Sequence, residues 1–263
     1  MLPQLAFNET EILAFALVFL RVSAFLVSWP IFSVYSVPAQ LKVLLSLVIA
    51  ILLFPVINRA GLDAQGFQQN IAWLAGKEVL TGLCLGFLTR LFFFAVTVGG
   101  SLIATSAGLA NGQIFNPVMG TNSTTVEQFY ATLATLLFLA LNGHHFFLEG
   151  LAQSFDAIPL TISGTEFASL ASKFKDSGLI LQSVSEAGIK IAAPVLVAVF
   201  LMNIVMGIIG KAVPQINVLV TSMPVNFMAA LLVMIVAIPA LVLELDREVV
   251  SFTEMLFKFM KAN

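Results

Sequence analysis

Long apolar runs separated by short polar stretches dominate the pattern of this chain. A helix needs about 20 mostly apolar residues to cross the hydrocarbon core of a bilayer. Runs that reach or approach this length cover residues 12–36, 41–57, 71–89, 91–110, 126–148, 187–210, 212–223 and 224–243. They are apolar on all sides, whereas the strands of a membrane barrel alternate with a period of two. The pattern therefore predicts an all-α integral membrane protein.

Prolines fall in or beside these runs at Pro30, Pro38, Pro55, Pro194, Pro214, Pro224 and Pro239. A proline lacks the backbone N–H and tends to kink or end a helix. Broken helices at membrane depth are tolerated where they pack against protein or line a water-filled cavity. We therefore expect proline-broken helical hairpins that pack within a larger helical assembly.

Two stretches mix polar and apolar residues instead. In the first of them, Phe167, Leu170 and Phe174 recur at helical spacing. This spacing is typical of an amphipathic helix at the membrane interface. The C-terminal tail carries a similar stripe. No soluble second domain stands out, so we expect a single membrane domain over residues 1–263. Its parts are N-terminal helices at 12–110, a loop at 108–125, C-terminal helices at 126–243 and an amphipathic tail at 244–263.

Composition agrees with a membrane protein and argues against several other functions. Hydrophobic residues make up 59% of the 263 positions and charged residues 10%, against about 25% charged residues in soluble domains. The net charge of −2 gives no basic surface for nucleic acid. The sequence has no nucleotide-binding loop, GxSxG or HExxH pattern, and His144 and His145 lack the cysteine or acidic cluster that would complete a metal shell. We expect no catalysis, no metal and no cofactor.

Arg21 lies near the middle of the first apolar run. An unpaired arginine at the bilayer centre costs about 3 kcal/mol on insertion scales, so its side chain should face protein, water or a partner. One interpretation is a pore or subunit contact. The interpretation that we favour is a buried ion pair with Glu78 or with another subunit, and Lys77 poses the same question.

Gly82 and Gly86 form a GxxxG pattern in the segment "TGLCLGF". In membrane helices this spacing lets a second helix approach closely. We expect these two glycines to form a helix-packing face.

Four separated segments carry a family pattern over nearly the whole chain. They are "LRVSAFLVSWPIFSVYSVPAQLKVLLSLVIAILLFP" at 20–55, "KEVLTGLCLGF" at 77–87, "LLFLALNGHHFFLEGLAQSFDAIPL" at 136–160 and "PQINVLVTSMPVNF" at 214–227. The shared residues include Leu20-Arg21-Val22, Pro30, Pro38, Lys42 and Pro55 in the first segment and Asn142-Gly143-His144 in the third. In this order the segments resemble the FliR/SctT family of type III secretion export-gate subunits.

The resemblance implies a non-enzymatic subunit of the flagellar type III protein export gate. Such a subunit assembles with FliP and FliQ into a closed helical channel, contacts FlhB and other export-apparatus proteins, and lets unfolded flagellar proteins cross the bacterial inner membrane at the flagellar basal body. Three alternatives stay open: the equivalent subunit of a virulence injectisome, a small-solute transporter or channel, and a non-conducting membrane scaffold.

The loop "GLANGQIFNPVMGTNSTT" at 108–125 interrupts the apolar pattern without any charge. Glycines permit backbone conformations that bulkier residues resist, and uncharged polar residues can meet water in a pore without the cost of a buried charge. The resemblance implies a plug inside the closed channel, made of Gly108, Asn111, Gly112, Phe115, Asn116, Pro117, Gly120 and Asn122. An ordinary exposed connection is the alternative. The family often has an acid where this chain has Asn116, and a glycine where Ser222-Met223 precede Pro224.

Overall fold

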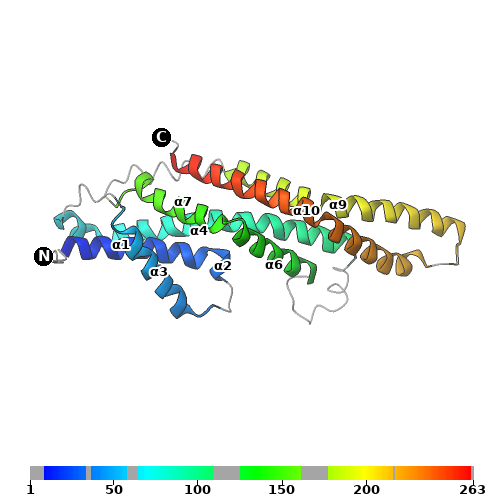
Figure 1. Ribbon diagram of the computed structural model, residues 1–263, viewed down its shortest axis with the longest axis horizontal. Helices are drawn as coiled ribbons and strands as arrows, with labels where there is room; N and C mark the ends of the chain where they lie inside the picture. The colour runs from blue at the N-terminus through cyan, green and yellow to red at the C-terminus, as the bar shows by residue number, and fades with distance from the viewer. Residues whose placement is uncertain are drawn as a thin grey trace. The chain divides into compact units, whose positions relative to one another are not determined.

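The computed structural model describes residues 9–33, 37–57, 64–108, 125–160, 177–215 and 217–261, and these residues form helices joined by short turns (Figure 1). The helices are α1 (Glu9–Ser28), α2 (Pro30–Ser33), α3 (Ala39–Leu53), α4 (Ala64–Ser106), α6 (Thr125–Ala140), α7 (Gly143–Ala157), α9 (Ser177–Ala212) and α10 (Val218–Lys261). No strand occurs within the described ranges. Four segments are long and apolar enough to cross a membrane, namely Glu9–Ser28, Asn70–Ser106, Gln182–Ala212 and Val220–Phe252. The predicted all-α membrane fold is confirmed.

Prolines lie both at helix boundaries and inside helices. At boundaries or in turns the structure places Pro30, Pro38, Pro55 and Pro214. Pro194, by contrast, lies inside α9, and Pro224 and Pro239 lie inside α10. The predicted boundary between the runs 212–223 and 224–243 is therefore wrong, because one helix covers all of the second run and part of the first. Each proline removes only a single backbone hydrogen bond, and membrane helices tolerate this loss when neighbouring groups compensate.

A break without proline divides the apolar run 126–148 instead. α6 ends at Ala140 and α7 begins at Gly143. Between them Asn142 has a φ of 57°, in the left-handed region that asparagine adopts more readily than most residues. The N–H of Leu141 still donates to the carbonyl oxygen of Leu137 at 2.8 Å, so α6 completes its last turn before the chain bends. The two helices together are apolar enough for one broken span.

The two predicted amphipathic stretches differ in what the structure describes. Phe167, Leu170 and Phe174 lie outside the described residues. The tail continues α10 as far as Lys261. Leu245, Val249 and Phe252, which recur at helical spacing in it, are buried. The tail is thus the end of a long helix rather than a separate element.

The chain folds into two compact units, each assembled from separate segments. The first comprises residues 1–91, 143–178 and 252–263, and the second comprises residues 92–142 and 179–251. α4, α9 and α10 each have residues in both units.

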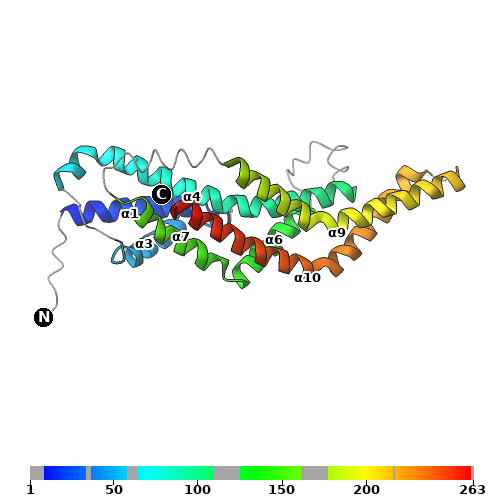
Figure 2. The same ribbon diagram turned by 90° about the horizontal axis from the view of Figure 1, so that it is seen from above.

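In the first unit α1 packs against α3, the N-terminal half of α4, and α7 (Figures 1 and 2). The large apolar side chains that these helices enclose most completely include Leu17, Phe25, Leu26, Leu74, Phe147 and Leu151. Trp29, just after α1, meets Phe147 edge-on with ring centroids 6.1 Å apart, a favourable geometry for aromatic pairs. These contacts join α1 to α7 across a large separation in the sequence.

In the second unit α9 and α10 run side by side as an antiparallel hairpin (Figure 1). The side chain of Val218 lies against Gly210 at the closed end of the hairpin. The C-terminal half of α4 meets α9 at a second pair of glycines. A methyl group on Gly99 would stand 3.0 Å from the carbonyl oxygen of Gly188, and one on Gly188 would stand 2.9 Å from that of Ala95. The two helices can approach this closely because neither carries a side chain at the crossing.

Gly82 provides a test of the close approach between α1 and α4. A methyl group there would overlap the backbone oxygen of Arg21, whereas one on Gly76 in the same helix would meet nothing within 4 Å. We expect Gly82→Ala to lower the free energy of unfolding by about 1–3 kcal/mol, the usual cost of overpacking. Gly76→Ala, the matched control, should be neutral or slightly stabilising because alanine is the better helix former. Thermal unfolding of the purified chain in detergent measures both, and equal midpoints would contradict the packing.

Candidate functional site

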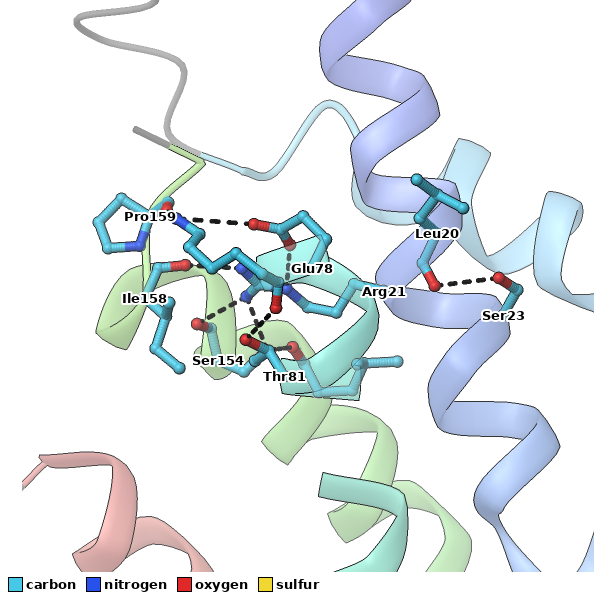
Figure 3. A network of polar contacts seen from close by, with 10 residues as sticks. Leu20, Arg21, Ser23, Glu78, Thr81, Ser154, Ile158 and Pro159 are labelled. Atoms are coloured by element: carbon cyan, nitrogen blue, oxygen red, sulfur yellow. Dashed lines mark hydrogen bonds and ion pairs between the residues drawn. The ribbon is translucent and has the colours of Figure 1, made fainter. Parts of the chain in front are cut away.

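A cluster of buried charges lies where α1, α4 and α7 meet in the first unit (Figure 3). Arg21 comes from α1, Lys77 and Glu78 come from α4, and Ser154 comes from α7. The backbone turns just after α7 add the carbonyl oxygens of Ile158 and Pro159 to the cluster. Figure 3 shows Glu78, Ser154 and Ile158 around the guanidinium of Arg21.

Arg21 uses every part of its guanidinium. Its Nε donates to Glu78 Oε2 at 2.5 Å, and one terminal nitrogen donates to both the carbonyl oxygen and Oγ of Ser154 at 2.8 and 3.1 Å. The other terminal nitrogen donates to the carbonyl oxygen of Ile158 at 2.8 Å. The guanidinium carbon also stands 4.0 Å from the centroid of the Phe155 ring, within the range of a cation–π contact. Arg21 is fully buried, and the protein supplies the contacts that water would otherwise make.

Lys77 extends the cluster towards the end of α7. Its Nζ donates to the carbonyl oxygen of Pro159 at 2.6 Å and lies 3.7 Å from Glu78 Oε1. That carboxylate oxygen accepts no hydrogen bond within the described part of the chain, so the charge of Lys77 compensates it at 3.7 Å without a hydrogen bond. Both side chains are almost wholly buried.

Two buried cations share one carboxylate in this cluster, and the structure compensates the extra positive charge with backbone oxygens. The last carbonyl groups of a helix have no partner within the helix and form the negative end of its dipole. Arg21 and Lys77 donate to oxygens at this end of α7, at Ser154, Ile158 and Pro159. The two cations thus cap the C-terminus of α7 and tie it to α1 and α4.

The glycine pair on α4 brings α1 close enough for this arrangement. Glu78 and Gly82 are four residues apart and therefore share a face of α4. A methyl group on Gly82 would overlap the carbonyl oxygen of Arg21, and one on Gly86 would overlap the Cβ of Ser28. With α1 lying directly on this glycine face, the Arg21 side chain reaches the carboxylate one turn away.

Of the loop residues named above, only Gly108 is among the described residues. Its φ of 81° is a left-handed conformation that glycine adopts without strain, and its N–H donates to the carbonyl oxygen of Thr105 at 3.1 Å. Near this end of α4, Gly100 packs against the start of α6, where an added methyl group would lie 3.2 Å from the Cα of Glu127. The described residues on either side of the loop, at the end of α4 and the start of α6, thus pack against each other. Outside the described residues lie Asn111, Gly112, Phe115, Asn116, Pro117, Gly120 and Asn122.

A second polar feature borders an apolar cavity of about 550 Å³ between α6, α9 and α10 in the second unit. Lys190 lines this cavity with Glu244, and its Nζ lies 3.0 Å from Glu186 Oε1 and 3.9 Å from Glu244 Oε1. No pattern considered in the sequence predicted this group, although the four-residue spacing of Glu186 and Lys190 on one helix was an available signal. The side chain of Lys190 is half exposed and that of Glu186 slightly more. We therefore expect this ion pair to contribute little to the stability of the fold.

The sequence signal for the first cluster was partial. An arginine inside an apolar run demands a partner, and Glu78 was an evident candidate. Ser154 and the carbonyl oxygens of Ile158 and Pro159 carried no such signal, because every residue has a carbonyl group and serine is common in membrane helices. The cluster fixes α1, α4 and α7 in register. Its side chains therefore position helices.

The fold and this cluster define a polytopic all-α membrane protein whose first spanning helix is held by buried charges. Residues 12–251 match bacterial export proteins, family 1, and the chain belongs to this family. It is 31% identical over 245 residues to flagellar biosynthetic protein FliR of Bacillus subtilis (strain 168), covering 91% of each chain. The FliR of Aquifex aeolicus (strain VF5) is 25% identical over 258 residues, covering 97% of this chain and 96% of its own. The FliR of Escherichia coli (strain K12) is 27% identical over 223 residues, covering 84% and 82%. The resemblance to the FliR family is confirmed.

Removal of the Arg21 side chain tests the cluster. Breaking a buried ion pair from one side leaves an uncompensated charge and typically costs about 3–5 kcal/mol. We expect Arg21→Leu to reduce the amount of folded chain in the membrane fraction severely, because Glu78 Oε2 and the carbonyl oxygens of Ser154 and Ile158 lose their donor. Adding Glu78→Leu should not restore it, because Lys77 would then be buried without its carboxylate. Protein level and the thermal midpoint in detergent measure both variants.

The half-exposed pair on α9 provides the control. Lys190→Met should change the thermal midpoint little, because exposed ion pairs gain little over solvation. If Arg21→Leu and Lys190→Met had the same thermal midpoint, the cluster would not be what stabilises the first unit.

Proposed function

We propose that this chain is a non-enzymatic subunit of the flagellar type III protein export gate in the bacterial inner membrane, at the flagellar basal body. With FliP and FliQ it forms the closed channel through which unfolded flagellar proteins cross, and it contacts FlhB and other export-apparatus proteins. The observation that carries the proposal is the family match over residues 12–251, together with FliR relatives aligned over most of their length. Residues 1–263 act as one export-gate domain.

The exposed surface of the chain supports a role within an assembly. α3 has 15 residues, which span only about 22 Å as a helix against a hydrocarbon core of about 30 Å. It nevertheless exposes Leu41, Val43, Leu44, Ile51 and Leu52. An apolar helix too short to span is better covered by other protein than by lipid alone. Partner subunits of a membrane complex supply such a cover.

The engagement of Arg21 favours this function over a small-solute transporter. A transporter needs charged or polar groups free to bind a solute at mid-membrane, and Arg21 was the sequence candidate for that role. All three nitrogens of its guanidinium donate to groups of the same chain. The named relatives are flagellar proteins, which favours the flagellar apparatus over an injectisome.

Deletion and co-purification test the proposed function. We expect deletion of the gene to abolish flagella and swimming, and an affinity-tagged full chain that restores both to co-purify with FliP and FliQ from detergent-solubilised membranes. Electron microscopy of cells and immunoblots of the purified complex give the two readouts. Normal motility in the deletion strain, with the chain recovered as a functional monomer, would contradict the proposal.

We further propose that residues 108–125 plug the closed channel. Deletion of residues 110–120 should make cells leak ions, because an uncharged polar segment would no longer fill the pore. Membrane-potential dyes and ion efflux measure the leak in cells whose complex still contains FliP and FliQ. Unchanged permeability in such an assembled complex would favour the exposed connection. Replacing 110–120 by an equally long Gly/Ser segment separates the filling of the pore from the length of the loop.

A further inference from the structure

The apolar cavity between α6, α9 and α10 is long as well as large. Its volume of about 550 Å³ is typical of a small-molecule pocket, for which about 300–1,000 Å³ is usual. On α10 its lining extends from Phe227 to Glu244, which corresponds to about 25 Å along the helix axis. That length exceeds half of a hydrocarbon core about 30 Å thick. The cavity can therefore take an acyl chain that reaches from one membrane surface to the middle of the bilayer.

Charged side chains mark the level at which the cavity meets the membrane surface. Between Lys190 and Lys211, residues 191–210 of α9 carry no charge. As a helix this interval is about 30 Å long, the thickness of the hydrocarbon core. Lys190 therefore lies at one boundary of the core, where lipid headgroups begin. Glu244 follows the uncharged first part of α10 and lies beside Lys190, so the cavity ends at the same boundary.

Lys190 and Glu244 both keep hydrogen-bonding capacity for a ligand. The ammonium of Lys190 has three N–H donors, and Glu186 lies 3.0 Å from it as an acceptor for one of them. Glu244 lies 3.9 Å from Lys190 and 3.7 Å from Arg247, beyond hydrogen-bond distance. The Glu244 side chain is only 20% exposed, yet among the described residues no donor hydrogen-bonds to its carboxylate. A ligand in the cavity can supply that donor.

The charges at this end of the hairpin favour a zwitterionic headgroup. Ion contacts link Glu186, Lys190, Glu244 and Arg247, two carboxylates and two cations whose charges cancel. Glu248, one turn beyond Glu244 on the same face, adds a negative charge. A headgroup with a net negative charge gains little here, whereas a phosphate with an attached ammonium can bind cations and carboxylates at once. A primary ammonium also brings N–H donors, which a quaternary one lacks.

We propose that this cavity binds a phospholipid whose headgroup carries a phosphate and a primary ammonium, that is, a phosphatidylethanolamine. Its phosphate binds Lys190 and Arg247, its ammonium donates to Glu244, and one acyl chain lies along α10 towards Phe227. The inference goes beyond the proposed function and does not depend on it, because it uses only the membrane class of the chain and contacts within the second unit.

Lipid titration of the purified chain tests this site. The affinity-tagged full chain is purified from membranes in detergent, freed of lipid, and titrated with phosphatidylethanolamine, phosphatidylcholine or phosphatidylglycerol of identical acyl chains. Native mass spectrometry measures the lipid bound per chain. We expect phosphatidylethanolamine to bind roughly three- to tenfold more tightly than either of the others, the range of one hydrogen bond. Equal binding of the three lipids would overturn the inference, and so would the absence of bound lipid, as expected where protein fills the cavity.

Two pairs of variants locate the bound lipid. Lys190→Met removes the phosphate contact and should weaken binding of phosphatidylethanolamine roughly three- to tenfold. Lys211→Met, the same change at the other end of the uncharged part of α9, should bind as the unaltered chain does. Ala237→Phe adds a ring to the cavity lining and should weaken binding roughly tenfold, the value of about two buried methylene groups. Its control is Val236→Phe, which changes an 80% exposed neighbour outside the lining.

Glu244→Gln separates recognition of the headgroup from folding of the hairpin. The change keeps the size of the side chain and removes its negative charge, so this variant should bind phosphatidylethanolamine and phosphatidylcholine about equally. A merely structural role of Glu244 would leave the lipid preference unchanged. The thermal midpoint of each variant in lipid-free detergent measures folding. If Glu244→Gln kept the preference, or if folded Ala237→Phe bound lipid as Val236→Phe does, the inference would be refuted.

Discussion

A guanidinium that cannot reach water determines how the first unit is held together. Arg21 is fully buried, and its donors are met by Glu78, 57 residues away, and by Ser154 and Ile158, 133 and 137 residues away. In a medium without water each of these donors needs a protein acceptor. One side chain therefore requires three helices to meet at one level. The same contacts give carbonyl groups at the end of α7 a hydrogen-bond donor. The helix terminus and the buried guanidinium thus supply each other with hydrogen-bond partners.

Close helix approach is the second condition, and small residues provide it in both units. Gly82 and Gly86 let α1 lie on α4 in the first unit, and Gly99 and Gly188 let α4 lie on α9 in the second. Between lipid-exposed helices the hydrophobic effect gives little net attraction, so packing and polar contacts decide which faces pair. In both units glycines bring helix backbones together, and in the first unit Arg21 and Glu78 then form the specific contact.

The apolar surface that the chain leaves exposed is consistent with a place in an assembly. α3 is too short to span and exposes apolar side chains, and the α9–α10 hairpin exposes apolar residues together with Asn203. Lipid can cover the apolar part of this surface, whereas a helix too short to span is better covered by other protein. A subunit of a multi-protein export gate has such partners, which agrees with membership in a family of bacterial export proteins.

The sequence by itself determined the helical membrane class, the positions of the apolar runs, the family, and the need of Arg21 for a partner, because hydropathy and charge are properties of neighbouring residues. Only the tertiary structure decided that Pro194, Pro224 and Pro239 lie inside helices while Asn142 marks a break. It also decided which acceptors serve Arg21 and Lys77, since backbone carbonyls are present at every position and only the packing selects Ile158 and Pro159. The meeting of Asn203 with Asn226 likewise depends on the register of two long helices, and an apolar pattern leaves that register open.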